Sequence, residues 1–265
     1  METEILSYLP ADHPWRDRFH YFDIIDSTNN RAKQMAAQGA PHGTVLVADQ
    51  QLQGRGRMGR SFLSPPGCGI YLSVILRPDC SAEQLMHLTC ASAVAVCDAA
   101  QAALDFLPRI KWTNDIVWQG KKLSGTLTEL SISATGRVDY AVVGIGINCC
   151  QTLDDFPPDI RQIATSMALA SRKGVDRSKL TAALIVALSH ISDKLLTGRR
   201  EIMDTYRKDC ITTGQRISVV RGDSVRHGLA LSVDDLGALL VAFDEGTTEA
   251  VNAGEVSIRG MYGYV

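Results

Sequence analysis

The segment that decides the fold runs from residue 110 to residue 148 and reads IKWTNDIVWQGKKLSGTLTELSISATGRVDYAVVGIGIN. Its runs Ile110 to Trp118 and Lys122 to Ser133 have the pattern of hairpin strands, and a turn at residues 134–136 leads into a further run, Val138 to Ile147. Strands that follow one another through short turns pair antiparallel. The segment therefore predicts the antiparallel half of a sheet.

Outward from this segment, strand and helix patterns alternate. Further strands are expected at Tyr21 to Ile25, Thr44 to Ala48 and Gly69 to Leu76, and helices from Asp26-Ser27-Thr28 to Gly39, Ser81 to Leu104, Ser178 to Leu196 and Arg199 to Lys208. The helix at Ser81 to Leu104 is rich in alanine and poor in charge, which is typical of a buried helix. These patterns predict an α+β domain over residues 1–212, with a mixed, mostly antiparallel sheet flanked by helices.

The texture of the chain changes after Thr213-Gly214. Residues 215–260 form short alternating runs divided by turn sequences such as Arg221-Gly222-Asp223 and Asp244-Glu245-Gly246. Short strands at this spacing are typical of a small β barrel. We therefore predict a second domain over residues 213–265.

Composition excludes several classes of protein. The chain has 265 residues, 45% hydrophobic content and a formal net charge of −2, so no overall positive field attracts nucleic acid or an anionic membrane. Seven cysteines without CxxC spacing indicate reduced thiols, and the histidines form no HExxH pair that predicts zinc. No signal peptide and no long uncharged apolar run is visible. These features predict a cytoplasmic protein with no membrane span.

The most distinctive segment is the loop Gln51-Leu-Gln-Gly54-Arg55-Gly56-Arg57-Met58-Gly59-Arg60-Ser61, called the GRGR loop below. Glycines let backbone N–H groups turn toward a ligand, and arginine forks match carboxylate or phosphate. As a P-loop it has the glycine spacing, but Arg60 replaces the lysine and Pro65-Pro66 prevents a following helix. A nucleic-acid arm would repeat the motif, and a plain solvated loop remains the default for a single charge cluster.

Two further segments favour a ligand site. Lys111-Trp-Thr-Asn-Asp115 and Gly120-Lys-Lys-Leu-Ser-Gly125 place a carboxylate and ammonium groups on neighbouring strands, where they can converge, although Lys121-Lys122 also suits a solvated hairpin tip. Gly144-Ile-Gly-Ile-Asn148 ends a buried strand with two glycines and an amide. It fails as a dinucleotide fingerprint because Cys149 stands at the third glycine position and no helix follows.

Taken together, these segments resemble one family. The motifs that carry the resemblance are Asp26-Ser27-Thr28-Asn29, Gln51-x-x-Gly54-Arg55-Gly56-Arg57, Lys111-Trp112-x-Asn114-Asp115, Lys122-Leu123-x-Gly125 and Gly144-x-Gly146-x-Asn148. Their order is similar to that of biotin protein ligases, the biotin–[acetyl-CoA-carboxylase] ligases. The resemblance implies a class II synthetase-like catalytic domain, followed by a small SH3-like β barrel. Thr113 and Ser124 depart from the family's usual proline and alanine.

The resemblance also implies an activity and a set of roles. The enzyme would use ATP and Mg²⁺ to convert biotin to biotinyl-5'-AMP, then transfer biotin to a lysine of a biotin carboxyl carrier protein. Biotin would contact Ser27, Thr28, Asn29, Gln51, Arg55, Gly56, Arg57 and Lys122; ATP would contact Arg55, Lys111, Asn114, Asp115, Gly125 and Asn148; the catalytic residues would be Lys122, Arg57, Asp115 and Lys111. No protein ligand to a metal is assigned.

Some alternatives stay open at this point. A lipoate ligase shares the chemistry but has an Arg-Arg…Gly-Gly-Gly…His-Asp pattern, which is absent here, and an inactive biotin-binding protein would not need Lys111, Asp115 and Lys122. A nucleic-acid-binding module disagrees with the net charge. Because only about two dozen residues precede Ser27, too few for a winged-helix domain, we expect no role in DNA binding. Pairing of two copies through an exposed edge at Val138 to Ile147 would give a homodimer.

Overall fold

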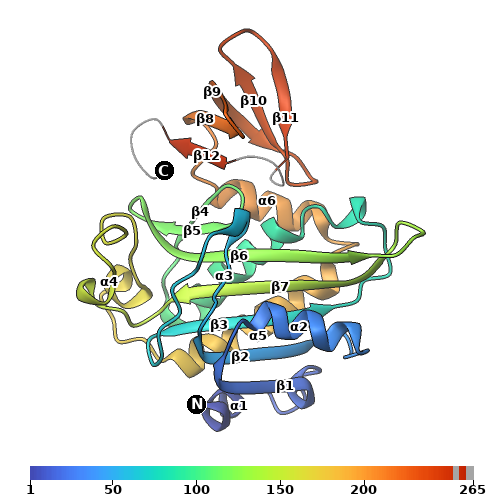
Figure 1. Ribbon diagram of the computed structural model, residues 1–265, viewed down its shortest axis with the longest axis vertical. Coiled ribbons are helices and arrows are strands. Elements are labelled where there is room, and N and C mark those ends of the chain that lie inside the picture. The colour runs from blue at the N-terminus through green and yellow to red at the C-terminus, as the bar shows by residue number, and fades with distance from the viewer. Residues whose placement is uncertain (253–256, 261–265) are drawn as a thin grey trace.

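A computed structural model describes residues 1–252 and 257–260, and Figure 1 shows its elements. The N-terminal domain contains α1 (Glu2–Tyr8), β1 (Phe19–Ile25), α2 (Thr28–Ala37), β2 (Thr44–Gln51), β3 (Gly69–Leu76), α3 (Leu88–Leu104), β4 (Arg109–Lys111), β5 (Asp115–Trp118), β6 (Lys121–Ile132), β7 (Val138–Asn148), α4 (Met167–Ser171), α5 (Arg177–Lys194) and α6 (Arg199–Asp209). Short 3₁₀ helices lie at Arg16–Arg18, Arg57–Gly59, Glu83–Leu85 and Leu153–Asp155. The C-terminal domain contains β8 (Arg216–Arg221), β9 (Ser224–Val233), β10 (Leu239–Phe243), β11 (Thr248–Val251) and β12 (Ser257–Gly260).

The N-terminal domain is built on a seven-stranded sheet in the order β1-β2-β3-β7-β6-β5-β4. Strands β1 and β2 pair parallel because α2 carries the chain back between them, and every other neighbouring pair is antiparallel. The predicted mixed, mostly antiparallel α+β fold is confirmed.

Strand β7 lies in the interior of this sheet, paired with β3 on one side and β6 on the other. The prediction that Val138 to Ile147 forms an exposed edge is therefore wrong. The run Ala141 to Ile145 is buried because helices cover both faces of the sheet here, and the sheet's edges are β1 and β4. Pairing of two copies through β7 is excluded.

Helices cover the two faces of the sheet unequally (Figure 1). Helix α2 packs against β2, β3 and β7 on the face turned toward the viewer, whereas α3 packs on β4, β5 and β6 from behind and contacts α5 and α6. Strand β3 is buried along its whole length because it lies between these layers. By length and composition the helical stretch Glu83–Leu104 could cross a membrane, but 72% of its apolar window is buried inside the fold, as in a core helix.

Three helices differ from the sequence prediction. Helix α4 was not predicted, because its five residues give too short a pattern. Helix α3 begins at Leu88 rather than at residue 81, because residues 83–85 form a separate 3₁₀ turn and His87 occupies the N-cap. Helix α1 was not predicted, since seven residues give too short a pattern; it is anchored by Ile5, which is fully buried against α5.

The C-terminal domain is a five-stranded antiparallel sheet in the order β11-β10-β9-β8-β12. It follows α6 after a short connection, in which the predicted boundary at residues 212–213 lies. Trp112 contacts both the connection and the C-terminal domain: its backbone N–H donates to Thr212 Oγ1 at 2.9 Å, and its indole Nε1 donates to the carbonyl of Gly237 at 2.9 Å.

Candidate active site

A cavity of about 420 Å³ opens between the sheet and the GRGR loop, a size typical of small-molecule sites. All predicted site residues except Asn148 line it: Ser27, Thr28, Asn29, Gln51, Arg55, Gly56, Arg57, Lys111, Asn114, Asp115, Lys122 and Gly125. These residues come from the start of α2, the end of β2, the loop after it, and strands β4 to β6. The fold therefore brings four separate stretches of sequence, residues 27–29, 51–57, 111–115 and 122–125, to one cavity.

One end of the cavity is formed by uncharged polar side chains, most of them buried. The Thr28 backbone N–H and hydroxyl donate to Gln51 Oε1 at 2.9 and 3.0 Å. Ser73 Oγ, fully buried on β3, lies 2.8 Å from Thr28 Oγ1 and 2.7 Å from Asn29 Oδ1. Gln51 Nε2 donates to Ser64 Oγ at 3.0 Å. Fixed donors and acceptors of this kind suit a flat ligand that carries both groups.

Ser27 stands at the N-cap of α2, as the sequence predicts. Its side chain is 1% exposed and makes no capping hydrogen bond, and it lines the cavity instead. An N-cap hydroxyl normally satisfies a backbone N–H in the first turn of its helix. Here the hydroxyl is turned toward the ligand space.

Two glycines of β7 form the floor of the cavity. A Cβ on Gly144 would lie 1.8 Å from Asn29 Oδ1, and a Cβ on Gly146 would lie 2.6 Å from the ring of Phe62. Real Cβ atoms essentially never approach other atoms below 3.0 Å. Only glycine at these positions lets α2 and the segment after the GRGR loop come so close to the strand.

The other end of the cavity is charged. Lys122 Nζ lies 2.5 Å from Asp115 Oδ1 across β5 and β6, and Lys111 is the register partner of Asp115 on β4. Arg57 Nη1 donates to Asn114 Oδ1 at 2.9 Å. Burial lowers the pKa of Arg57, but a guanidinium remains charged at physiological pH. The convergence predicted for this hairpin is present, and it concentrates positive charge around a single carboxylate.

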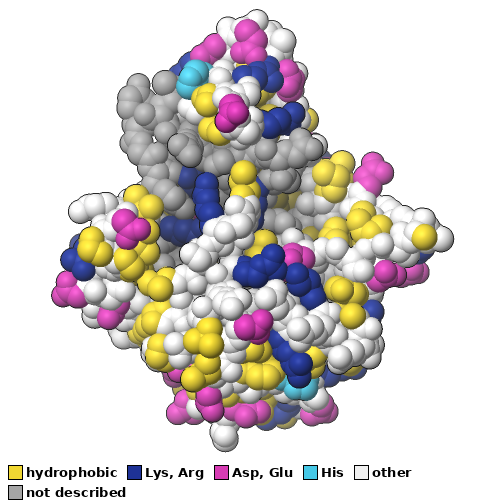
Figure 2. Space-filling model, viewed as in Figure 1, with side chains coloured by type: hydrophobic (Ala, Val, Ile, Leu, Met, Phe, Trp, Pro, Cys, Tyr) yellow, Lys and Arg dark blue, Asp and Glu magenta, His cyan; other side chains and the backbone are white. Residues whose placement is uncertain are grey.

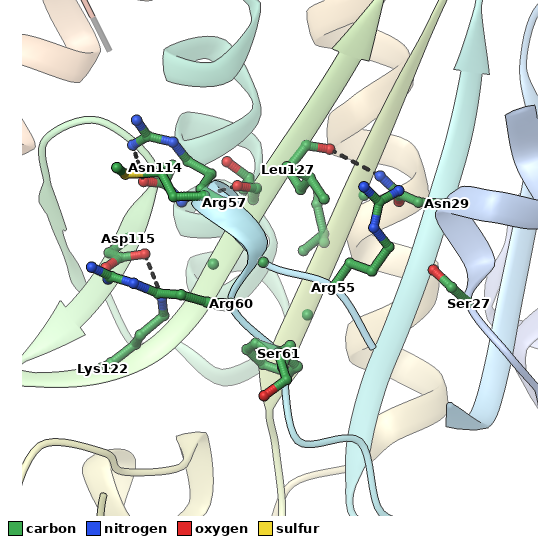
Figure 3. Close-up of a pocket in the computed structure, with 18 of the residues that line it drawn as sticks. Ser27, Asn29, Arg55, Arg57, Arg60, Ser61, Asn114, Asp115, Lys122 and Leu127 are labelled. Atoms are coloured by element: carbon green, nitrogen blue, oxygen red, sulfur yellow. Dashed lines mark hydrogen bonds and ion pairs between the residues drawn. The ribbon is translucent and has the colours of Figure 1, made fainter. Parts of the chain in front are cut away.

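The GRGR loop folds as a tight hairpin over the cavity. Residues Arg55 and Ser61 form a bridge, the Gly56 N–H donates to the carbonyl of Arg60 at 2.7 Å, and Met58 turns the chain with φ 55°. In Figure 3, Arg55 points toward Asn29, whereas Arg57 and Arg60 point toward the charged end. The loop therefore serves both ends of the cavity.

Arg60 was not among the predicted site residues, although it lines the cavity. Its position in the arginine series was the one available signal. Figure 2 shows lysine and arginine side chains gathered over the middle of this face, below the C-terminal domain. A slightly acidic chain thus has a local positive surface where the cavity opens.

Asn148 lies in a second cavity, of about 150 Å³, which is separate from the first but shares Ser61, Phe62 and Lys122 with it. Asn148 is 8% exposed, and its Nδ2 donates to the carbonyl of Thr165 at 3.1 Å. The remaining walls are mainly apolar, with Phe156 and Ile160 among them. Asn148 therefore lies in an adjoining, mainly apolar pocket, because β7 carries it past the end of the main cavity, and its predicted place beside the nucleotide stays a prediction.

Within the described ranges 1–252 and 257–260, no group of three acidic, histidine or cysteine side chains could hold a metal ion. Asp115 is the acidic residue lining the main cavity. Mg²⁺ commonly enters with a nucleotide, held by phosphate oxygens, water and one or two carboxylates. The residues present are compatible with that arrangement.

The fold and this site define a class, the biotin and lipoate protein ligases. The model of the Biotin/lipoate A/B protein ligase family matches residues 21–148, and the model of the biotin protein ligase C-terminal domain matches residues 212–259.

Individual relatives narrow the class. The chain is 37% identical over 234 residues to the bifunctional ligase/repressor BirA of Bacillus spizizenii, covering 88% of this chain and 72% of that protein. It is 31% identical to the biotin--[acetyl-CoA-carboxylase] ligase of Mycobacterium tuberculosis, over 93% of this chain and 90% of that one. The structure of the biotin protein ligase from Aquifex aeolicus in complex with biotin and ATP superposes with a TM-score of 0.78 at 29% identity, covering 91% and 98%. This chain belongs to the biotin protein ligase family.

Proposed function

We propose that this protein activates biotin with ATP, as biotinyl-5'-AMP, and transfers the biotin to a lysine of a biotin carboxyl carrier protein. The observation that carries the proposal is the division of one cavity into a buried polar end and a charged end that contains Lys122. A ligand with a ureido ring at one end and a carboxylate at the other matches this division. The biotin and ATP bound by the Aquifex aeolicus relative support the same assignment.

The polar end would hold the ureido ring. Its carbonyl needs donors and its two N–H groups need acceptors, and Ser27, Thr28, Asn29 and Gln51 supply both. Thr28 is hydrogen-bonded to Gln51, and Thr28 and Asn29 are both hydrogen-bonded to Ser73, so these side chains lose little entropy when a ring binds. An analogue without ureido N–H groups would leave buried acceptors unpaired, which is strongly unfavourable.

The first reaction joins two anions. A carboxylate oxygen of biotin attacks the α-phosphorus of ATP, the new bond is an acyl phosphate, and the bond to the β-phosphate breaks to release pyrophosphate. The chain contributes position and charge neutralisation, from Lys122 between carboxylate and phosphate and from Arg57 and Arg55 of the GRGR loop. Mg²⁺ delivered with ATP would lower the charge on the phosphates, and Asp115 is the cavity carboxylate that could contact it.

The nucleotide extends from Lys122 toward the second cavity. Lys122 lines both cavities, so the α-phosphate would lie at their junction. The apolar walls of the second cavity suit a purine ring, and Asn148 supplies an amide beside it. Lys111, Asn114 and Gly125 would flank the phosphate and ribose from the strands that carry them.

The second reaction transfers the acyl group. The neutral amine of the acceptor lysine attacks the acyl carbon, and AMP leaves with the bridging oxygen. Asp115 would orient that amine or receive its proton, and Lys122, 2.5 Å away, would compensate the charge of the carboxylate. The hairpin form of the GRGR loop would shield the adenylate from water meanwhile.

The cellular setting is part of the same proposal. All seven cysteines are free, and several of them are buried, which suits a reducing cytoplasm. The proposed acceptor is supported by the names of two relatives, which are biotin--[acetyl-CoA-carboxylase] ligases. The absence of a DNA-binding role and the formation of a homodimer stay predictions.

Biotin-dependent exchange of pyrophosphate into ATP tests the proposal, with purified protein, Mg²⁺ and lipoate as the control substrate. Exchange with biotin alone is the expected result. Exchange with lipoate alone would move the chain to the sister branch of the matched family. Exchange with neither substrate would leave a binding protein without ligase activity.

A further inference from the structure

We propose that Glu129 is a positioning residue that ties the GRGR loop to the polar end of the cavity, through one carboxylate shared by Arg55 and Asn29. The inference rests on the proposed function for its consequence, but its structural core does not depend on that function. Glu129 belongs to none of the five motifs, and it lies outside the residues that line the cavity. It is carried by β6, opposite Val142 of β7.

The first tie is an ion pair with the loop. Arg55 Nη1 donates to Glu129 Oε1 at 3.1 Å and lies 3.5 Å from Oε2, and the same nitrogen donates to Asn30 Oδ1 at 3.0 Å. The Arg55 side chain is 43% exposed, so the pair restrains the loop without fixing it permanently. A restraint of this strength suits a loop that must admit a ligand.

The second tie is to the cavity itself. Asn29 Nδ2 donates to Glu129 Oε2 at 3.0 Å and to the carbonyl of Leu127 at 3.3 Å. This fixes the amide so that Oδ1 faces Ser73, 2.7 Å away. The orientation of Asn29, and with it the pattern offered to a ureido ring, depends on the carboxylate that also holds Arg55.

The hydrogen bonds continue from Asn29 to the opposite end of the GRGR loop. They run through Ser73, Thr28, Gln51 and Ser64 to the carbonyl of Phe62, with the last contact at 2.9 Å. The loop is thus attached at Arg55 by Glu129 and just beyond Ser61 by Ser64, with the buried polar end between the two attachments. A bound ring that breaks or strengthens any hydrogen bond in this series therefore affects both attachments of the loop.

A third partner of Glu129 allows Arg55 to leave the carboxylate without leaving it unpaired. Lys33 Nζ of α2 lies 2.7 Å from Glu129 Oε1 and belongs neither to the loop nor to the cavity. Burial alone would raise the pKa of Glu129, but hydrogen bonds from Lys33 and Asn29 and the charges of Lys33 and Arg55 outweigh it, so the pKa is lowered. When Arg55 turns to a substrate anion, Glu129 keeps a charge partner.

Limited trypsin digestion without ligands tests the structural core. Cleavage after Arg55, Arg57 or Arg60 reports opening of the loop, and cleavage after Arg221, the exposed last residue of β8, is the internal reference. Glu129→Gln keeps an acceptor for Asn29 but loses the charge that holds Arg55. We expect loop cleavage relative to the reference to rise about two- to five-fold, as for loss of an exposed ion pair. Lys33→Ala, which removes the partner outside the loop, should leave the ratio unchanged.

Glu129→Ala provides a second variant, because it also removes the acceptor for Asn29. In it the loop should be cleaved faster, and in exchange assays the KM for biotin should rise more than the KM for ATP, because Asn29 belongs to the biotin end alone. A uniform rise at the reference site, or equal loop cleavage in Glu129→Gln and wild type, would overturn the proposal. The digestion is then repeated with biotin and ATP. If the loop loosens as expected but the added biotin and ATP do not slow its cleavage, the proposed ligase function is contradicted, while the role of Glu129 in holding the loop stands.

Discussion

Lys122 and Asp115 lie on neighbouring antiparallel strands with Nζ and Oδ1 2.5 Å apart, and both side chains retain a partly exposed surface toward the cavity. A pair deep in a core would be evidence of a structural role. This pair lies where two cavities meet, since Lys122 lines both. The lysine is therefore held in place before a substrate anion arrives.

Replacing Lys122 with alanine should abolish adenylation and leave the fold intact. Loss of one preorganised cation at a site of developing charge typically lowers the rate 10²–10³-fold, so pyrophosphate exchange should fall by about that factor or more. Lys121→Ala is the matched control, because Lys121 lines neither cavity. Near-normal exchange in the Lys122 variant, with an unchanged melting curve, would remove Lys122 from the reaction.

Arg57→Gly should release the adenylate before transfer. Arg57 is the loop arginine that donates to Asn114, at 2.9 Å, so its loss frees the GRGR loop from the charged end. Escaped biotinyl-AMP would then label lysines of bystander proteins, which streptavidin blotting of a mixture with added albumin would detect. Arg57→Lys keeps the charge but loses the planar fork, and it should label bystander proteins less than Arg57→Gly does. Labelling confined to the true acceptor would show that this arginine does not retain the adenylate.

The sequence identified the main cavity because its residues occur as short motifs of unusual composition. It could not reveal Ser73, which reads as one polar position in a buried strand, or Glu129, which reads as an ordinary surface position of β6. The role of each residue depends on a hydrogen bond to Asn29, which lies far away in the sequence.

The order of the strands in the sheet is a second feature that the sequence did not predict. The alternation of Val138 to Ile147 predicts a strand but does not say whether one or two neighbours flank it, and β7 has two. The position of Asn148 beyond the main cavity follows from that same strand path. Local patterns predicted most of the elements, whereas the pairing that separates the two cavities is a property of the whole sheet.

Gly144→Ala should weaken biotin binding selectively. The added Cβ would lie 1.8 Å from Asn29 Oδ1, so either the amide turns or β7 shifts. We expect the KM for biotin to rise about tenfold or more, equivalent to about 1.4 kcal/mol, with little change in the KM for ATP. Gly174→Ala is the control, since a Cβ there meets nothing within 4 Å and its φ is ordinary. Equal KM values for biotin in the two variants would show that the glycine floor does not shape the ring site.

The lowered pKa of Glu129 predicts a pH dependence of stability. A carboxyl group whose pKa is depressed by folding stabilises the protein above its unfolded pKa, 4.5 here, and that contribution is lost as the pH falls through the folded value. Wild type should therefore melt at a higher temperature than Glu129→Gln at pH 7, and the gap should shrink progressively below pH about 4.5. Calorimetry from pH 3 to pH 7 measures the gap. A difference that is constant with pH would mean that the carboxylate charge does not stabilise the fold.

Trp112→Phe should weaken the contact between the two domains without creating a large cavity in the core around residue 112. Trp112 is 4% exposed, and its indole Nε1 donates to the Gly237 carbonyl at 2.9 Å, so phenylalanine leaves that carbonyl unpaired. We expect a loss of about 1–3 kcal/mol in the free energy of unfolding, measured by urea denaturation. Because Trp112 also lines the cavity beside Lys111, part of the effect should appear in the kinetics of pyrophosphate exchange.

Tyr206→Phe is the matched comparison: its hydroxyl donates to the Thr113 carbonyl at 3.1 Å within the N-terminal domain. Both variants should lose stability, but only Trp112→Phe should make the C-terminal domain exchange its amide hydrogens faster than the sheet below it. If the two exchange profiles coincide, the indole contact is part of general packing and does not couple the domains.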